Sequence, residues 1–363
     1  MSFKISKLQV RNFRNLYPDV IDFSPKINCI LGENGNGKTN ILEAVYFLCT
    51  RKSFRKNAGF PQFLGVDGDK PEIYLSSVFL DDEERKKSLS VKMEQGGNTW
   101  AIDGHISKKR DLHSSVFINP FDSYSFHTNT TFRRAWFDDH FCMLDKNYKK
   151  TLSNFQSALK FRNALLSKKP YKFKEQLPAI DKELAKASLE LLKLRQVYLK
   201  QLVPLVSQSF REIFSQEHEL QIELDSKWIQ FDEKQIVSAL QLGLEKDEIL
   251  GFTKYAVHKD DYTLLFDGFN SLDFCSLGQQ KMSYLSLIFA YIEQFKYKYN
   301  SFPIVLIDDV SGELDGHRWQ RLVTYLEKRQ FQVLITTANE KFKEELEKIE
   351  GAKQFIVSGG AIN

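Results

Sequence analysis

The chain has 363 residues, of which 42% are hydrophobic and 27% charged, and its formal net charge at pH 7 is +4. This is an ordinary globular composition with room for two or three domains, and no run of residues is apolar enough to span a bilayer. A strand pattern begins directly after Met1, so we expect no secretion signal. The four scattered cysteines lie in apolar contexts, so we expect them to be free thiols in a cytoplasmic protein. The seven histidines have no metal-ligand spacing with the cysteines, so we expect no structural zinc site.

The beginning of the chain reads as short strands followed by a helix. Alternating apolar residues predict strands over residues 3–10 and 20–23, which would pair as an antiparallel flap. Residues 26–31 read as a short buried strand, and apolar residues at helical spacing predict an amphipathic helix over 39–49.

The loop between that strand and that helix fits the phosphate-binding pattern G-x-x-x-x-G-K-[ST], the P-loop. Its residues are Gly32, Glu33, Asn34, Gly35, Asn36, Gly37, Lys38 and Thr39. The glycines let backbone N–H groups turn toward phosphates in front of the positive end of a helix. We predict that the loop binds a nucleotide, that Lys38 reaches its β- and γ-phosphates and that the Thr39 hydroxyl holds Mg²⁺. A glycine-rich turn without a ligand is the alternative, and the strand and helix on either side argue against it.

Strands and then helices follow. Strands are predicted over residues 73–80, 87–93, 99–102 and 116–118, and helices over 132–144, 148–167 and 182–214. Pro204 lies late in the last helix and is expected to kink or split it. Leucines near heptad spacing in the same helix predict a short antiparallel helical arm.

The predicted arm is basic. Residues 149–200 contain thirteen Lys/Arg and four Asp/Glu, a net of +9, so the rest of the chain carries about −5. This local excess indicates either a polyanionic partner or a solvated lysine-rich face, and composition leaves both interpretations open. The basic residues gather at Lys149, Lys150, Lys160, Arg162, Lys168, Lys169, Lys172 and Lys174, and in a second cluster at Arg51, Lys52, Arg55 and Lys56. We expect both clusters to contact duplex phosphates with little reading of bases.

The last part of the chain returns to strands and helices. It predicts strands over 219–224 and 262–266, a helix over 233–244 and a long apolar helix through residue 295. The apolar run 303–307 is typical of a central parallel strand, as is 333–335, whereas 353–357 reads as an edge strand.

Two carboxylates follow the apolar run 303–307, which is the Walker B pattern. We expect Asp308 to complete the Mg²⁺ shell. Asp309 would accept a proton from the attacking water or orient it. Acidic residues often follow strands without such a role, but the combination with a P-loop on a parallel sheet favours the nucleotide site.

The long apolar helix begins with a third motif. Residues 275–279 resemble the ABC-ATPase signature L-S-G-G-Q, with Cys275 in the Leu place and Leu277 in the first Gly place. A serine that merely caps its own helix is the alternative. The resemblance implies that Ser276, Gly278 and Gln279 contact the γ-phosphate of a nucleotide held by a second copy, and hence a head-to-tail homodimer.

The chain as a whole resembles the RecF family, bacterial recombinational-repair ATPases of the ABC/SMC-like class. The segments that carry the resemblance, in order, are residues 10–15, 32–47, 53–55, 133–138, 148, 161–166, 258–261, 279–281 and 308–310. Some positions depart from the family pattern. Gly312 stands where the family has Ser, Lys259 replaces an Arg, and Thr337 takes the place of the ABC switch histidine. The ABC Q-loop glutamine has no clear counterpart, and Asn119 or Asp122 is the nearest candidate.

The resemblance implies an α/β fold, an ABC-type P-loop head with a mixed sheet and helices and an inserted helical arm. The head would comprise residues 1–125 and 216–363, the second part with the signature and Walker B, and the arm residues 126–215. It further implies ATP and Mg²⁺ as cofactors and slow, DNA-stimulated ATP hydrolysis. ATP-dependent dimerisation would occur at single-strand/double-strand DNA junctions, with help in loading RecA at gaps together with RecO and RecR. These activities would serve recombinational repair, replication restart and SOS induction.

Three other functions share part of this pattern. The ATPase subunit of a membrane transporter has the same motifs, but the basic arm and the missing Q-loop argue against it, and we expect no membrane partner. An SMC-type chromosome scaffold needs hundreds of heptad residues. A DNA-binding module with a decayed ATPase is disfavoured by the intact Lys38, Thr39, Asp308 and Asp309.

Overall fold

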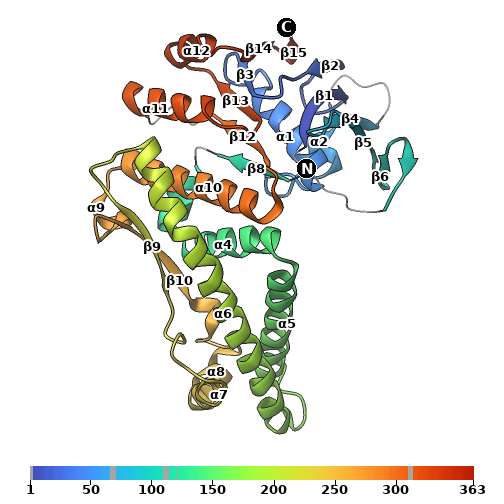
Figure 1. The fold of residues 1–363 in the computed structure, drawn as a ribbon. Coiled ribbons are helices and arrows are strands. Elements are labelled where there is room, and N and C mark those ends of the chain that lie inside the picture. Colours follow the sequence, from blue (N-terminus) through green and yellow to red (C-terminus); the bar gives the residue numbers. More distant parts are fainter. Residues whose placement is uncertain (1–2, 66–70, 109–113, 120, 310–313) are drawn as a thin grey trace. The chain divides into compact units, whose positions relative to one another are not determined.

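The structure is a computed structural model that describes residues 3–65, 71–108, 114–119, 121–309 and 314–363 (Figure 1). By their contacts the residues form two compact units. Unit 1 comprises Met1–Ser123, Glu212–Ser215 and Ile292–Asn363, and unit 2 comprises Tyr124–Arg211 and Gln216–Tyr291.

These units differ from the division that the sequence predicts. The first boundary falls at residue 123, close to the predicted 125, but residues 216–291 group with the helices of unit 2 and not with the remainder of the expected head. The P-loop and Asp308 therefore belong to unit 1, and the signature segment belongs to unit 2. The functional division into an ABC head and an arm stays a prediction.

The first sheet of unit 1 is mainly parallel, with the order β15-β14-β3-β13-β12-β8. Its strands are β3 (Ile27–Leu31), β8 (Ser115–Ile118), β12 (Ile304–Asp308), β13 (Val333–Thr337), β14 (Lys353–Ser358) and β15 (Ala361–Ile362). All residues of β3 and β13 are buried, as expected for central strands covered on both faces. The prediction that 353–357 is an edge strand is wrong, because β14 pairs with both β3 and the two-residue β15, which is too short to leave a periodic pattern.

The second sheet of unit 1 is antiparallel, with the order β2-β1-β4-β5-β6-β7. Its strands are β1 (Lys4–Arg11), β2 (Asp19–Asp22), β4 (Ile73–Leu80), β5 (Lys86–Glu94), β6 (Gly97–Ile102) and β7 (His105–Ile106). The antiparallel pairing of the first two strands is confirmed. Helix α1 (Lys38–Thr50) contacts strands of both sheets, and its Ile41, Leu42 and Val45 belong to the shared apolar core. Helices α2 (Phe60–Phe63), α11 (Gly316–Glu327) and α12 (Glu340–Glu347) complete the unit.

Unit 2 consists of helices and one small sheet with the order β11-β10-β9. Its strands are β9 (Leu220–Asp225), β10 (Asp261–Phe266) and β11 (Phe269–Asn270). Its helices, including those that cross its boundary, are α3 (Asp122–Thr128), α4 (Thr130–Leu144), α5 (Lys146–Lys168), α6 (Phe173–Ile213), α7 (Glu233–Leu242), α8 (Leu244–Leu250), η1 (Val257–Lys259), α9 (Ser271–Phe274) and α10 (Leu277–Tyr299). Helices α5 and α6 form the predicted hairpin, joined by an ion pair between Arg162 and Asp181.

Helix α6 is continuous over 41 residues although Pro178 and Pro204 lie inside it. The sequence predicts that Pro204 kinks or splits this helix, and the split does not occur. A proline inside a helix removes one i→i−4 hydrogen bond, but Leu202, Val206 and Phe210 are fully buried around this position. Their packing holds the helix together where the local sequence alone predicts a break.

Candidate nucleotide site

The P-loop lies between β3 and α1, in the strand–loop–helix order that the sequence predicts. Gly32, Gly35 and Gly37 have φ of 148°, 84° and 108°, a region that favours glycine. A Cβ atom at Gly32 would lie 2.3 Å from the Val357 carbonyl oxygen, so no larger residue fits there. The glycines at the two ends of the loop therefore meet a structural need of this fold as well as the motif.

Lys38 begins α1 and is buried. Its Nζ donates to the carbonyl oxygens of Gly32 at 2.7 Å and Glu33 at 2.8 Å. Burial lowers the pKa of Lys38, while the carboxylates of Asp309 and Asp308 oppose this shift. An anion beside the amine would favour its charged form, so the site is electrostatically suited to a phosphate.

Thr39 and Asp308 come from positions 269 residues apart and meet at this site. The Thr39 hydroxyl donates to the Asp308 carboxylate, with oxygen–oxygen distances of 2.9 and 3.1 Å. The Thr336 hydroxyl donates to the same carboxylate at 2.8 Å. Strands β3, β13 and β12 are parallel neighbours, so their carboxyl ends lie at one edge of the sheet. The structure thus brings together the two residues expected to hold the metal.

The donor set suits Mg²⁺. A hydroxyl and a carboxylate are hard oxygen ligands, which Mg²⁺ prefers. Burial raises the pKa of Asp308, against the hydrogen bonds from Thr336 and Thr39 that lower it. A cation next to Asp308 would favour its ionised form. Thr39 and Asp308 therefore fit the role predicted for them.

Asp309, the predicted base, has a left-handed backbone with φ 36°. Its N–H donates to the Thr336 carbonyl oxygen at 3.2 Å and to the Thr336 hydroxyl at 3.1 Å. The sequence pattern points to the next residue, Thr337, whose hydroxyl accepts a hydrogen bond from Asn339 N–H. The sequence pattern does not point to Thr336, which contacts both Asp308 and Asp309. Only the register of β12 against β13, which pairs Asp308 with Thr336, reveals this residue. Residues 310–313, including Gly312, lie outside the described residues.

The Q-loop candidates lie at the end of β8. Because β8 is parallel to β12 and Ile118 pairs with Ile307, Asn119 follows at the position next to Asp308. The Asn119 Oδ1 accepts a hydrogen bond from Phe121 N–H at 2.9 Å. Burial raises the pKa of Asp122 to about 6. The register therefore favours Asn119 over Asp122 for the Q-loop position, and its role stays a prediction.

The signature residues stand at the beginning of α10. Ser276 and Gln279 form a reciprocal capping pair, in which Gln279 N–H donates to the serine hydroxyl and Ser276 N–H to the Gln279 side chain. Gly278 lies half-buried in the first turn. The Gln280 side chain donates to the carbonyl oxygens of Ser271, Leu272 and Cys275. The helix start is thus fixed to the segment before it, and the Ser276 side chain caps its own helix.

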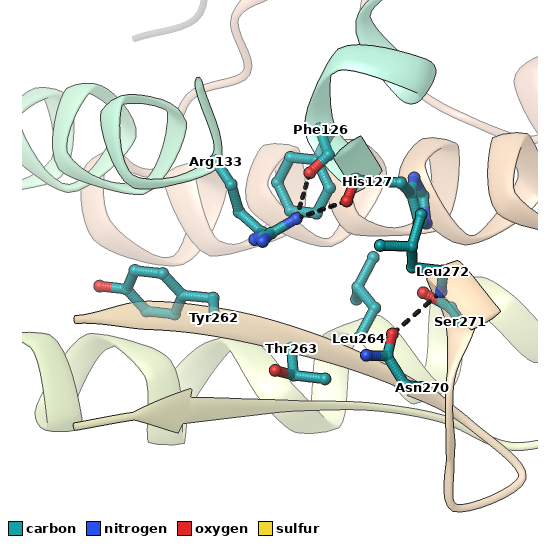
Figure 2. Close-up of a pocket in the computed structure, with 9 residues that line it drawn as sticks. All are labelled: Phe126, His127, Arg133, Tyr262, Thr263, Leu264, Asn270, Ser271 and Leu272. Atoms are coloured by element: carbon teal, nitrogen blue, oxygen red, sulfur yellow. Dashed lines mark hydrogen bonds between the residues drawn. The ribbon is translucent and has the colours of Figure 1, made fainter. Parts of the chain in front are cut away.

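A cavity of about 40 Å³ lies beside the segment that leads to the signature (Figure 2). The Arg133 guanidinium donates to the Phe126 and His127 carbonyl oxygens and pairs with Asp261. The other lining residues are Tyr262, Thr263, Leu264, Asn270, Ser271 and Leu272. This volume holds one or two water molecules, so the cavity does not accept a nucleotide.

Several residues that carry the family resemblance form buried ion pairs inside unit 2. Arg162 is fully buried and donates to Asp181, Asp247 and Thr253 at 2.6–2.8 Å. Arg195 is also buried and pairs with Asp138 at 3.0 Å. The expectation that Arg162 belongs to a DNA-binding cluster is therefore wrong, because the side chain is buried and paired with two aspartates of the same unit.

The other basic residues differ in their availability. Lys168, Lys169, Lys172 and Lys174 are exposed, with ion pairs only from Lys172 to Glu175 and from Lys174 to Glu248 among the described residues. In the second cluster, Arg55 pairs with buried Glu43, and Arg51 lies 4.4 Å from the centre of the Trp100 ring. The lysines of unit 2 are thus better placed for an external anion than the arginines after α1.

Comparison with known proteins places this geometry in a family. The model of the RecF/RecN/SMC N terminal domain matches residues 4–356. The chain is 30% identical over 368 residues to the DNA replication and repair protein RecF of Clostridium kluyveri, covering 99% of each chain. It is 29% identical over 374 residues to the RecF of Bacteroides thetaiotaomicron, covering 99% of this chain and 98% of that one.

Solved structures agree. A structure of the recombination mediator protein RecF with ATP, assigned to the RecFOR pathway, superposes with a TM-score of 0.83 at 25% identity and covers 100% of this chain and 97% of that one. An Smc head domain from Pyrococcus furiosus shares the fold, with a TM-score of 0.60 at 15% identity over 99% and 95% of the two chains. In the described part of the chain, no helix is both long and apolar enough to cross a membrane. The chain belongs to the RecF family of ABC/SMC-like ATPases.

Proposed function

We propose that this chain is an ATP-dependent DNA-binding repair protein that acts, as its relatives' names indicate, in DNA replication and repair. The observation that carries the proposal is the convergence of Lys38, Thr39 and Asp308 at one edge of a parallel sheet in a chain of this family. These residues supply the cation, the hydroxyl and the carboxylate that a P-loop ATPase needs around Mg-ATP.

Each residue has a distinct task in this proposal. Thr39 and Asp308 would hold Mg²⁺, which neutralises charge on the phosphate oxygens when bound. Lys38 would leave the Gly32 and Glu33 carbonyls and donate to the β- and γ-phosphates, together with the backbone N–H groups of residues 32–37. Asp309 would orient the attacking water and accept its proton. Hydrolysis is expected to be slow and to be stimulated by DNA.

The proposed site is completed by a second copy of the chain. Ser276, Gly278 and Gln279 would contact the γ-phosphate of the partner's ATP, so that ATP favours the dimer and ADP does not. In the structure Ser276 and Gln279 cap their own helix, whose N-terminus is an anion-binding end. Their side chains can exchange this capping pair for phosphate contacts when the dimer forms.

DNA is the proposed polyanion for the exposed lysines of unit 2. The proposed binding sites on DNA are single-strand/double-strand junctions. There the protein would act with RecO and RecR to load RecA at gaps. The structure of a relative assigned to the RecFOR pathway supports this assignment. Phosphate contacts through lysine give affinity without base specificity, which suits a protein that recognises a junction and not a sequence.

Measuring the mass of the protein by light scattering, with ATP, ADP or no nucleotide and with and without gapped DNA, tests the proposal. We expect a dimer only with ATP, and DNA should favour it further. The Ser276→Arg variant should bind ATP as a monomer with nearly unchanged affinity and form no dimer. The same mass under all conditions would refute the ATP-dependent dimer, whereas loss of ATP binding in Ser276→Arg would refute the assignment of Ser276 to the partner's site.

A further inference from the structure

Two segments that are remote from the P-loop in sequence form hydrogen bonds with it. In the connection between β1 and β2, Asn15 Nδ2 donates to the Gly35 carbonyl oxygen at 3.0 Å, and its Oδ1 accepts from Asn40 Nδ2 at 2.6 Å. In the turn between β14 and β15, Gly360 N–H donates to the Asn36 carbonyl oxygen at 3.0 Å. The second bond joins residues from opposite ends of the chain within unit 1.

The same two segments also hold each other. Tyr17 N–H donates to the Gly360 carbonyl oxygen at 3.0 Å. Gly360 has φ 93°, and a Cβ atom there would lie 1.9 Å from the Asn15 carbonyl oxygen. Backbone therefore approaches backbone so closely that only glycine fits this position. At the other end of the P-loop, the Val357 carbonyl of β14 lies against Gly32.

The bond from Gly360 fixes the orientation of one peptide group of the P-loop. The peptide between Asn36 and Gly37 is planar and trans, so its N–H points opposite to its C=O. Because the Asn36 C=O is held by Gly360, the Gly37 N–H is directed away from the β14–β15 turn. An N–H group held in this way before a ligand arrives costs no reorientation when it meets a phosphate oxygen.

We propose that the β14–β15 turn is a positioning element of the nucleotide site. Through Gly360 it fixes the Asn36–Gly37 peptide so that the Gly37 N–H faces the phosphates, and phosphate binding in turn tightens the β14–β15 hairpin. This inference rests on the proposed binding of a nucleotide by the P-loop. It assigns the segment from Lys353 to Ile362 a role in binding that its strand pattern does not reveal.

Two neighbouring glycines provide a matched pair of variants. Gly359 and Gly360 both have positive φ, 56° and 93°, so alanine strains the backbone at either position. At Gly359 no atom lies within 4 Å of the added Cβ, whereas at Gly360 the Cβ meets Asn15. Gly360→Ala must displace the turn and break its bond to Asn36, and Gly359→Ala need not.

The equilibrium affinities of both variants for Mg-ATP and Mg-ADP test the proposal. We expect Gly360→Ala to weaken both by about fivefold and Gly359→Ala by less than about twofold, since one missing hydrogen bond is worth about 1 kcal/mol. Thermal unfolding of both variants separates reduced affinity from reduced folding. A folded Gly360→Ala protein with the affinity of the Gly359→Ala protein would overturn the inference.

Hydrogen exchange on the unaltered chain gives a second test that does not depend on a variant folding. On addition of ATP or inorganic pyrophosphate, amides of residues 353–362 should exchange about three to ten times more slowly, while β4 and β5 stay unchanged. If the P-loop residues 32–39 become protected but 353–362 do not, the positioning role is refuted and the nucleotide site stands. If residues 32–39 show no protection, the proposed function itself is refuted.

Discussion

Buried charges are treated differently in the two units. In unit 2 the guanidinium of Arg162 is fully buried and meets two carboxylates, Asp181 and Asp247, together with the Thr253 hydroxyl. In unit 1 the Asp308 carboxylate accepts hydrogen bonds from the hydroxyls of Thr39 and Thr336. Lys38 and Arg55 interact with it electrostatically, but among the described residues no cation forms a salt bridge with it. The Arg162 guanidinium has two carboxylates in direct contact, whereas the Asp308 carboxylate has no cation in direct contact among the described residues.

This difference separates structural from functional charge. A buried ion whose partners are all present stabilises one conformation and has nothing left to offer a ligand. A buried carboxylate held by neutral hydroxyls keeps a raised pKa and gains most from an added cation, which is typical of a binding site. Both residues lie in segments that carry the family resemblance, so the resemblance alone does not distinguish their roles.

The largest effect is expected from Asp309. Asp309→Asn should keep ATP binding and dimerisation but slow hydrolysis by roughly 10²–10⁴-fold, the usual contribution of a positioned base. Asp308→Ala should instead weaken Mg-ATP binding, because the metal loses its carboxylate. Single-turnover hydrolysis and equilibrium binding, measured side by side, separate the two. Normal turnover by Asp309→Asn would remove its assigned role.

Arg162→Ala tests whether the buried charge network of unit 2 is structural. It leaves Asp181 and Asp247 buried without their cation and should destabilise unit 2 by about 3–5 kcal/mol. Lys160→Ala, two residues earlier on the exposed side of α5, is the matched control and should change stability by less than about 0.5 kcal/mol. Urea denaturation measures both. Equal stability of the two variants would show that the buried network is not structural.

The sequence predicts local features well where one element determines them. The P-loop, its strand and its helix follow from spacing alone, and the Walker B run predicts the meeting of Thr39 with Asp308. Interactions set by tertiary structure cannot be read in this way. Asp247 lies 85 residues from Arg162, so no periodicity reveals that the arginine is neutralised. The two-residue β15 carries no pattern, and Pro204 reads as a break until the buried residues around it are seen.

Asp260 is expected to contribute to the pH dependence of the stability of unit 2. Burial raises the pKa of Asp260 to about 7, although Arg195 nearby opposes the shift. An aspartate in the unfolded chain has a pKa near ~3.9. The folded state therefore binds the proton more tightly, and this contribution is complete below about pH 4 and lost as the pH rises through about 7.

Chemical denaturation between pH 5 and pH 8 measures this contribution. As the pH rises toward about 7, Asp260 should lower stability by up to about 1.4 kcal/mol for each pH unit, whereas His140 and His258, whose pKa values burial lowers to about 4, act in the opposite direction below about pH 6.5. Asp260→Asn should remove the Asp260 contribution, so the difference in stability between this variant and the unaltered chain should show that slope. Asp273→Asn is a control on an exposed aspartate of the same unit, so it should leave the slope in this range unchanged. An identical pH profile for Asp260→Asn and the unaltered chain would contradict the assignment.

Thr336 tests how the Asp308 carboxylate of unit 1 is held in place for a metal ion. Its hydroxyl donates to Asp308 and accepts from Asp309 N–H, and it is buried. Thr336→Val has nearly the same shape without the hydroxyl and should lower the Mg²⁺ affinity of the ATP complex by about 10–100-fold, as for other residues that orient metal ligands. Thr336→Ser restores the hydroxyl and should recover most of the affinity. Equal Mg²⁺ titrations for Val and Ser would show that Thr336 only fills space.

The smallest effects are expected from exposed charge in unit 2. Lys168, Lys169, Lys172 and Lys174 lie at the turn between α5 and α6, exposed and at most partly paired. Surface ion pairs such as Lys174–Glu248 contribute little and leave the charge accessible. Unlike Arg162, these lysines can therefore release counterions from a DNA phosphate backbone.

Reversing these four lysines to glutamate should weaken DNA binding for all sequences alike. The log–log dependence of affinity on salt should flatten by about one unit for each lysine–phosphate interaction that is removed, with ATP affinity in the absence of DNA unchanged. Lys182, Lys186, Lys193 and Lys200, exposed along α6, provide a reversal of the same total charge. If both sets flatten the slope equally, unit 2 attracts DNA by its overall charge, and the turn between α5 and α6 is not a contact surface. If neither does, the lysine-rich face is only solvated and DNA binds elsewhere on the protein.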